Sequence, residues 1–157
     1  MQREIINGFR LSPQQRRLWL LQQGSIAYRS QSAILIEGGL RPEVLKEAVY
    51  RTVKRHDILR TTFHSLPGMK LPIQVVAEES SPSSLPLWQE DDLSDWSAPE
   101  QTEKVEELFR EDRCCPFDFG QDRLLRAYLL SLSAERHILF LSLPSICAAR
   151  SARCRRC

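Results

Sequence analysis

The chain has 157 residues, of which 42% are hydrophobic and 27% charged, a composition typical of one soluble globular domain or one lobe of a larger one. Its formal net charge is +2, but removing the four arginines of residues 150–157 from the 22 basic residues leaves 18 against 20 acidic residues, a net of −2. A nearly neutral body excludes a basic footprint for nucleic acid, and no apolar run is long enough to span a bilayer. We therefore expect neither a nucleic-acid nor a membrane partner, and the absence of a signal-peptide pattern at the N-terminus predicts a cytoplasmic protein.

The five cysteines are an odd number for a disulfide framework. Cys114 and Cys115 are neighbours, which makes them a poor disulfide pair, and Cys147 stands alone. Cys154 and Cys157 have the CxxC spacing of two zinc ligands, but a structural zinc site needs four ligands and a second pair is absent. We expect free thiols and no metal.

The first predicted helix begins after Ser12. Ser12 suits the N-cap, Pro13 suits the first helical position, and Gln15 completes a capping box. A strand over residues 31–37 follows, and then a second helix from about Pro42 to Lys54 that has one apolar face.

Charged residues are concentrated after the second helix, in the segment Arg55–Phe63. Their spacing is too tight for a single solvent-facing surface. Two interpretations stay open: some of these charges turn inward, or Asp57 forms a local pair with an arginine at the helix end.

The middle of the chain contains a predicted strand over residues 71–77 and a Ser/Pro-rich loop over residues 78–86. Trp88 and Trp96 flank the acidic residues 90–92. An acid pair near aromatic rings either binds a cation or forms a solvated loop anchored by buried rings.

A third helix is predicted from the capping box of Ser97 and Glu100 to about Asp112. The strands over residues 124–132 and 137–143 are joined by a short turn, which predicts an antiparallel hairpin. The second of these strands is apolar at almost every position, which is typical of a strand buried on both faces. Because helices alternate with strands, the predicted fold class is α/β, a two-layer sandwich lobe.

Three segments together resemble the start of condensation domains of nonribosomal peptide synthetases. Leu11–Leu21 resembles the family's S-x-A-Q-x-R-L-W helix, with Gln14 in place of Ala. Arg55–Phe63 matches its R-H-E-x-L-R-T-x-F segment, with Asp57 in place of Glu, and Pro116–Pro144 resembles the stretch that leads to its catalytic signature. The residues that match the first two motifs are Ser12, Gln15, Arg17, Trp19, Arg55, His56, Asp57 and Arg60.

The resemblance implies half of a two-lobed fold like chloramphenicol acetyltransferase, with residues 1–149 as the N-terminal lobe and residues 150–157 as an irregular Arg/Cys-rich tail. The family forms peptide bonds by acyl transfer between thioesters that reach the cleft on phosphopantetheine arms. The implied partners are peptidyl or acyl carrier proteins and neighbouring synthetase domains, and the resemblance implies no directly bound cofactor. The family's second lobe has no counterpart in these 157 residues.

The family's signature, H-H-x-x-x-D-G, should follow the strand that ends at Leu143. Its two histidines fall on Pro144 and Ser145, its Asp on Ala149 and its Gly on Arg150. None of the catalytic residues is intact, and a serine is not an effective base near pH 7 without a partner base. We therefore expect the chain by itself to be non-catalytic.

Residues 150–157 have no apolar period, cap or turn chemistry, which favours a terminus made by truncation or a frame shift. An Arg-rich end could also contact nucleic acid or anionic lipid, or simply be an unstructured terminus.

Two other functions are considered. A lone lobe could dock a carrier protein or another synthetase subunit through the first helix and the Ser/Pro-rich loop. An independent enzyme would use Ser145 or Cys147 as its nucleophile, but apolar surroundings make a thiol inert, and His137 lies about 20–25 Å or more away along the strand.

The predicted hairpin carries apolar residues on both faces. We expect one lobe to cover only one of these faces with its helices. The other face, or the sheet edge beside it, should then be exposed, and the chain should self-associate through it.

Overall fold

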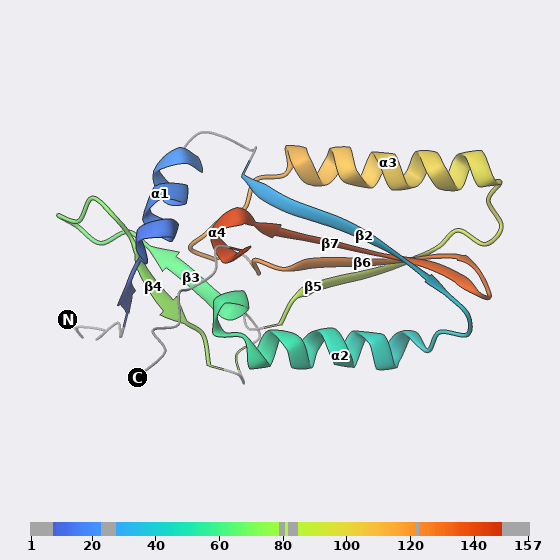
Figure 1. The fold of residues 1–157 in the computed structure, drawn as a ribbon, viewed down its shortest axis with the longest axis horizontal. Coiled ribbons are helices and arrows are strands. Elements are labelled where there is room, and N and C mark those ends of the chain that lie inside the picture. The colour runs from blue at the N-terminus through green and yellow to red at the C-terminus, as the bar shows by residue number, and fades with distance from the viewer. Residues whose placement is uncertain (1–7, 23–27, 79–80, 82–84, 122, 149–157) are drawn as a thin grey trace.

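The computed structural model of the chain describes residues 8–22, 28–78, 81, 85–121 and 123–148 (Figure 1). Its elements, in chain order, are β1 (Phe9–Arg10), α1 (Pro13–Gln22), β2 (Arg29–Glu37), α2 (Pro42–Arg55), the 3₁₀ helix η1 (Asp57–Arg60), β3 (Thr61–His64), β4 (Ile73–Val76), β5 (Leu87–Asp92), α3 (Ala98–Cys114), β6 (Arg126–Ser133), β7 (Arg136–Pro144) and α4 (Ser145–Ala148). The helices and strands predicted from the sequence are all present, with ends displaced by a few residues at most.

The strands form two sheets. A small antiparallel sheet has the order β1-β4-β3, and a four-stranded sheet has the order β2-β7-β6-β5. In the larger sheet β5 runs parallel to β6, whereas β2 and β6 both run antiparallel to β7. The predicted hairpin is confirmed as β6 and β7, and β7 is an interior strand flanked on both sides.

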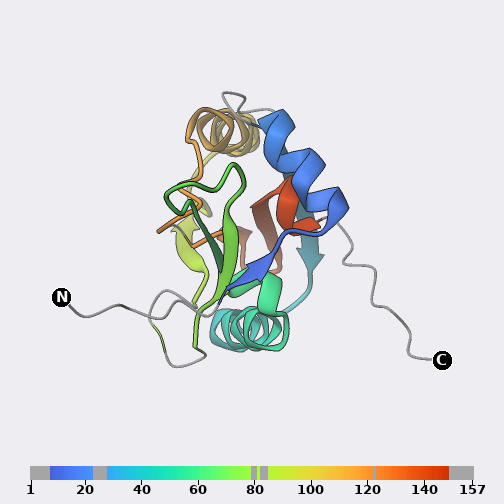
Figure 2. The ribbon, with the colours of Figure 1, turned by 90° about the vertical axis from the view of Figure 1, so that its left-hand side faces the viewer.

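Helices α2 and α3 lie on opposite sides of the four-stranded sheet (Figures 1 and 2). Successive residues of β6 point to opposite faces, yet Ala127, Leu129 and Leu130 are each at most 1% exposed. The expectation of an uncovered hairpin face is therefore wrong, because the lobe supplies one helix for each face. The predicted α/β lobe is confirmed, but a helix lies on each side of the sheet, which makes three layers in place of the two expected.

Exposed apolar side chains lie instead on the sheet edge beside the hairpin. Strand β2 is the last strand of the sheet, and its Ile34 and Leu35 are 45% and 50% exposed. These two neighbours point to opposite faces, an apolar pattern that is typical of a central strand. The edge, which was the second of the two expected places, is therefore where the sheet exposes apolar surface.

Residues 87–92 form the edge strand β5 and not the solvated loop that their acidic residues predicted. Pairing with β6 overrides the low strand propensity of Asp and Glu, because strand formation depends on the neighbouring strand more than on intrinsic preference. Trp88 is half-buried and donates a hydrogen bond from Nε1 to Glu90 Oε1 at 2.6 Å, whereas Trp96 is 46% exposed and anchors nothing in the core.

Two apolar clusters make up a large part of the core of the described residues. One joins Phe63, Leu124, Ile146 and Cys147, and the other joins Leu93, Leu108, Leu130 and Phe140. The second lies between α3 and the large sheet, where the rings of Phe109 and Phe140 meet edge-on at 4.7 Å. The first contains two residues of α4, so the segment directly after β7 is anchored in the core.

Both predicted capping boxes are present. Ser12 Oγ accepts a hydrogen bond from the Gln15 amide at 3.2 Å, and Gln15 Oε1 accepts one from the Ser12 amide at 2.9 Å. The hydrogen bonds that Ser97 donates to Glu100 close the box of α3 and lower the pKa of that carboxyl group. Gln15 also donates to Gln74 Oε1 at 2.9 Å, which joins the start of α1 to β4.

No helix in the described part of the chain is long and apolar enough to cross a membrane. The cytoplasmic location and the division of the chain at residue 149 stay predictions. Residues 149–157, which include the predicted tail, lie outside the described residues.

Candidate functional site

The end of β7 is the place to which the resemblance assigns the catalytic signature. β7 ends at Pro144, and the one-turn helix α4 follows directly. Pro144 is the register partner of Arg29 in β2, and the Ser145 amide donates a hydrogen bond to the Tyr28 carbonyl at 3.0 Å. Pro144 is buried and Ser145 is half-buried. Strand β2 therefore holds both of these positions, whereas residues 149 and 150 lie outside the described residues.

Among the described residues, no side-chain base is hydrogen-bonded to Ser145 or Cys147. Cys147 is 7% exposed, and burial raises the pKa of its thiol to about 12. His137 lies eight residues before Ser145, which corresponds to about 25 Å along a strand. Activation of Ser145 or Cys147 at neutral pH would need an adjacent base.

A buried carboxylate lies next to the same strand end. It belongs to Asp112 in the last turn of α3, whose side chain is 0% exposed. It accepts hydrogen bonds from Arg29 Nη1 at 2.8 Å, Gln31 Nε2 at 2.7 Å, Ser142 Oγ at 2.5 Å and Arg126 Nη1 at 3.2 Å. These five residues are called the Asp112 cluster below.

The two guanidinium groups of the cluster have further partners. The Cys115 carbonyl accepts hydrogen bonds from Arg29 Nη2 at 2.8 Å and Arg126 Nη1 at 3.0 Å, and the Pro116 carbonyl accepts one from Arg126 Nη2 at 3.0 Å. The Phe117 ring lies against both groups, with its centroid 4.0 Å from Arg126 Cζ and 4.9 Å from Arg29 Cζ. Buried charges are tolerated when they are paired and hydrogen-bonded, and these contacts meet that condition except at Arg29 Nε, which is buried without a hydrogen-bond partner.

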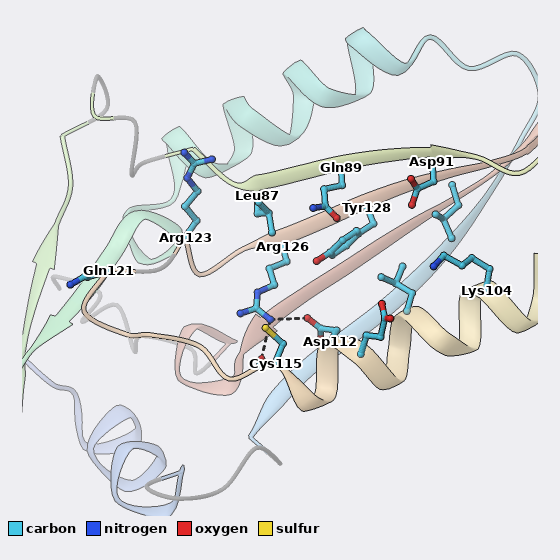
Figure 3. A pocket seen from close by; sticks show the side chains of 13 residues that line it. Leu87, Gln89, Asp91, Lys104, Asp112, Cys115, Gln121, Arg123, Arg126 and Tyr128 are labelled. Atoms are coloured by element: carbon cyan, nitrogen blue, oxygen red, sulfur yellow. Dashed lines mark hydrogen bonds and ion pairs between the residues drawn. The ribbon is translucent and has the colours of Figure 1, made fainter.

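A groove of about 580 Å3 lies beside the cluster, between α3 and the β5–β6 part of the sheet (Figure 3). Asp112 and Arg126 line one part of it, Tyr128 lies across its middle, and Lys104 and Asp91 lie farther along α3 and β5. Desolvation raises the pKa of Tyr128. The lining carries charges of both signs, and no group of three or more His, Cys, Asp or Glu side chains that could hold a metal ion occurs among the described residues.

The residues of the first motif lie at the start of α1 and along it. Ser12 and Gln15 form its capping box. Arg17 is exposed, and Trp19 is half-buried.

An aromatic cluster joins the three motif segments. The Trp19 ring stacks on Phe63 with centroids 5.8 Å apart and meets Phe119 edge-on at 5.4 Å, while Phe63 and Phe119 meet at 6.0 Å. Each ring comes from a different motif. The motifs therefore build one core, next to Ile146 of α4.

The residues of the second motif close α2. Arg55 and His56 are exposed at its end. Asp57 pairs with Arg60 at 2.5 Å, and Arg60, whose side chain is 12% exposed, also donates to the Ala77 carbonyl. Both interpretations of this segment hold in part, because Asp57 forms the local pair and Arg60 turns inward.

The Asp112 cluster was not predicted from the sequence. Helical spacing does place Asp112 on the same inward face of α3 as Leu108, and Arg126 is the one charged residue of the mostly apolar strand β6. A charged residue at a position that the pattern predicts to be buried is a sequence signal for a buried ion pair. No local sequence pattern, however, shows that these two charges lie next to each other.

The fold defines a class: an α/β sandwich lobe in which an interior strand ends beside a buried, ion-paired carboxylate. The family model of the condensation domain matches residues 6–144. The chain is 36% identical over 140 residues to tyrocidine synthase 3 of Brevibacillus parabrevis and 32% identical over 139 residues to gramicidin S synthase 2 of Brevibacillus brevis. The chain belongs to the condensation domain family.

A solved structure agrees with this assignment. The first condensation domain of the calcium-dependent antibiotic synthetase has a TM-score of 0.75 and 25% identity over 87% of this chain. The lobe therefore has the predicted chloramphenicol acetyltransferase-like fold. The matches to the two synthases each cover 87% of this chain but only 2% and 3% of the synthases themselves, and the structural match covers 32% of the solved chain.

Proposed function

We propose that this chain supplies the first lobe of a nonribosomal peptide synthetase condensation domain and does not form amide bonds by itself. In the family reaction the amine carried by one phosphopantetheine arm attacks the thioester on another, and the chain's partners are then carrier proteins and neighbouring synthetase domains. The observation that carries the proposal is the presence of Pro144 and Ser145 at the strand end. Proline has no titratable side chain, and serine is too weak a base to deprotonate an amine near pH 7.

Amide formation between two loaded carrier proteins tests this proposal. We expect no product above the uncatalysed background, while an intact condensation domain assayed in parallel gives turnover. Turnover by this chain would contradict the proposal, and a Ser145→Ala variant would then show whether Ser145 is responsible.

A docking role is the second candidate, and the exposed surface of α1 favours it. Arg16 and Arg17 are exposed, and Leu20 and Leu21 are 56% and 47% exposed. Mixed basic and apolar exposure suits a partner surface with acidic residues around an apolar centre. The Ser/Pro-rich loop, predicted as the other part of this surface, is only partly described.

Titration of a fluorescently labelled carrier protein tests docking. Binding in the micromolar range is expected for a transient contact, and Arg17→Glu should weaken it. Arg51→Glu, which reverses an exposed charge on α2, is the matched control and should leave binding unchanged. No signal change up to high micromolar concentration would contradict a docking role.

A further inference from the structure

We propose that Asp112 is a positioning residue, which holds the end of β7 and the first residue of α4 in the place where the condensation reaction has its catalytic signature. The inference rests on the proposed function, because the family reaction is what makes this strand end important. The contacts that carry it involve none of the signature side chains. The positioning therefore persists in a chain whose signature histidines are replaced.

Three members of the cluster form a row across the sheet. Gln31 of β2 and Arg126 of β6 are both register partners of Ser142 in β7. All three side chains donate hydrogen bonds to Asp112. One carboxylate from α3 therefore joins three adjacent strands at a single level of the sheet.

This row of residues lies directly before the positions that the resemblance assigns to the catalytic signature. Ser142 precedes Pro144 by two residues, so both side chains point to the same face of the sheet. Arg29, the fourth donor, is the register partner of Pro144. Its neighbour Tyr28 accepts the hydrogen bond from the Ser145 amide. Asp112 thus holds β7 just before the signature and β2 directly opposite it.

The strand end needs such support because β2 alone pairs with it. Leu143 and Pro144 have register partners in β2, whereas the register between β6 and β7 ends at Arg126 and Ser142. Side-chain hydrogen bonds to Asp112 provide a second connection between β2 and β7 at this point.

A buried carboxylate also fixes the relative position of the strand ends. An unpaired carboxylate is costly away from water, so a shift of one strand end that removed a donor from Asp112 would be strongly disfavoured. Apolar side chains of similar size would tolerate small shifts, because their attraction is not directional.

Amide hydrogen exchange on an Asp112→Asn variant tests the inference. The substitution keeps the side-chain shape but removes the charge. The Ser145 amide reports on the signature end of the β2–β7 pair, and the Gly38 amide, which donates to the Glu135 carbonyl at 2.8 Å, reports on the opposite end. Glu111→Gln, the same chemical change at an exposed neighbouring position, is the matched control.

In Asp112→Asn we expect exchange at Ser145 to accelerate about tenfold or more beyond any acceleration at Gly38, because the signature end of the sheet opens locally while a loss of global stability acts on both amides. Glu111→Gln should change neither rate. Equal acceleration at both amides would overturn the inference, because it would assign Asp112 to global stability alone. An unchanged rate at Ser145 would overturn it as well.

If Asp112→Asn does not fold, Ser142→Ala decides the matter. It removes one donor and keeps both ion pairs, so about threefold faster exchange is expected at Ser145 but not at Gly38. The same two outcomes would overturn the inference. Exchange requires neither carrier protein nor turnover, so its result is separate from that of the functional assays.

Discussion

Asp112 and Cys147 are both buried, but Asp112 has charged and polar partners whereas Cys147 has apolar neighbours. Asp112 is surrounded by two guanidinium groups and two neutral donors. Cys147 lies in an apolar cluster with Phe63, Leu124 and Ile146, and its pKa is raised to about 12. One position therefore holds a charge, and the other excludes it.

Replacement of Arg126 should destabilise the lobe strongly. Arg126→Met leaves Asp112 with one of its two guanidinium partners, and removing one partner of a buried pair costs about 3–5 kcal/mol in the free energy of unfolding. Urea denaturation measures this loss. Arg123→Met, at an exposed position, is the matched control and should stay within about 0.5 kcal/mol of the parent chain. Equal effects of the two substitutions would contradict the structural role of the cluster.

The rates of chemical labelling should differ between the buried and the exposed cysteine thiols. At pH 8 iodoacetamide should modify the exposed Cys114 and Cys115 quickly and Cys147 very slowly, because the thiolate is the reactive form. Peptide mass spectrometry distinguishes the sites. Labelling of Cys147 at the rate of Cys114 would show that its burial is not maintained in solution.

The raised pKa of the Cys147 thiol predicts that the free energy of unfolding falls in alkaline solution. Its pKa is raised from 9.0 to about 12 in the folded state. Between these values the unfolded chain releases a proton that the folded chain keeps. The free energy of unfolding should therefore fall as the pH rises through this range. A Cys147→Ala variant should show a shallower fall, and an identical pH dependence would contradict the prediction.

At the level of elements, α1 depends on the capping box at its start. Ser12→Ala removes the acceptor for the Gln15 amide and should lower the free energy of unfolding by about 1 kcal/mol. Thermal or urea unfolding measures the change. Gln14→Ala, at an exposed position in the same turn, should be nearly neutral. A neutral Ser12→Ala would show that the cap adds little to the anchoring of α1 through Trp19.

For the molecule as a whole, the edge strand β2 is the expected route of self-association. Among the described strands it has a neighbour on one side only, and it exposes Ile34 and Leu35, a combination that favours pairing with another chain. Sedimentation at micromolar concentration should show association that removal of the residues after Cys147 does not abolish.

Leu35→Lys should reduce that association, because a charge at an edge strand opposes pairing. Val44→Lys, which adds the same charge at an exposed apolar position of α2, should have a smaller effect. A parent chain that sediments as a stable monomer would contradict this prediction.

The sequence by itself determined the features that depend on neighbouring residues. The capping boxes at Ser12 and Ser97 lie within four residues, and the β6–β7 hairpin is joined by a short turn, so their signals are local. The three motifs also identified the family, because their order along the chain is visible without a structure. That Pro144 and Ser145 stand where the family has its signature histidines is also read from the sequence alone and stays a prediction.

Only the tertiary structure decided where distant residues meet. Arg29 lies 83 positions from Asp112 and Gln31 lies 81 positions from it, and no local pattern shows that these side chains share one carboxylate. Strand β5 exists because β6 pairs with it, against its own acidic composition, and both faces of the hairpin are covered because α2 and α3 return to opposite sides. Each of these features depends on long-range packing, which sequence periodicity does not encode.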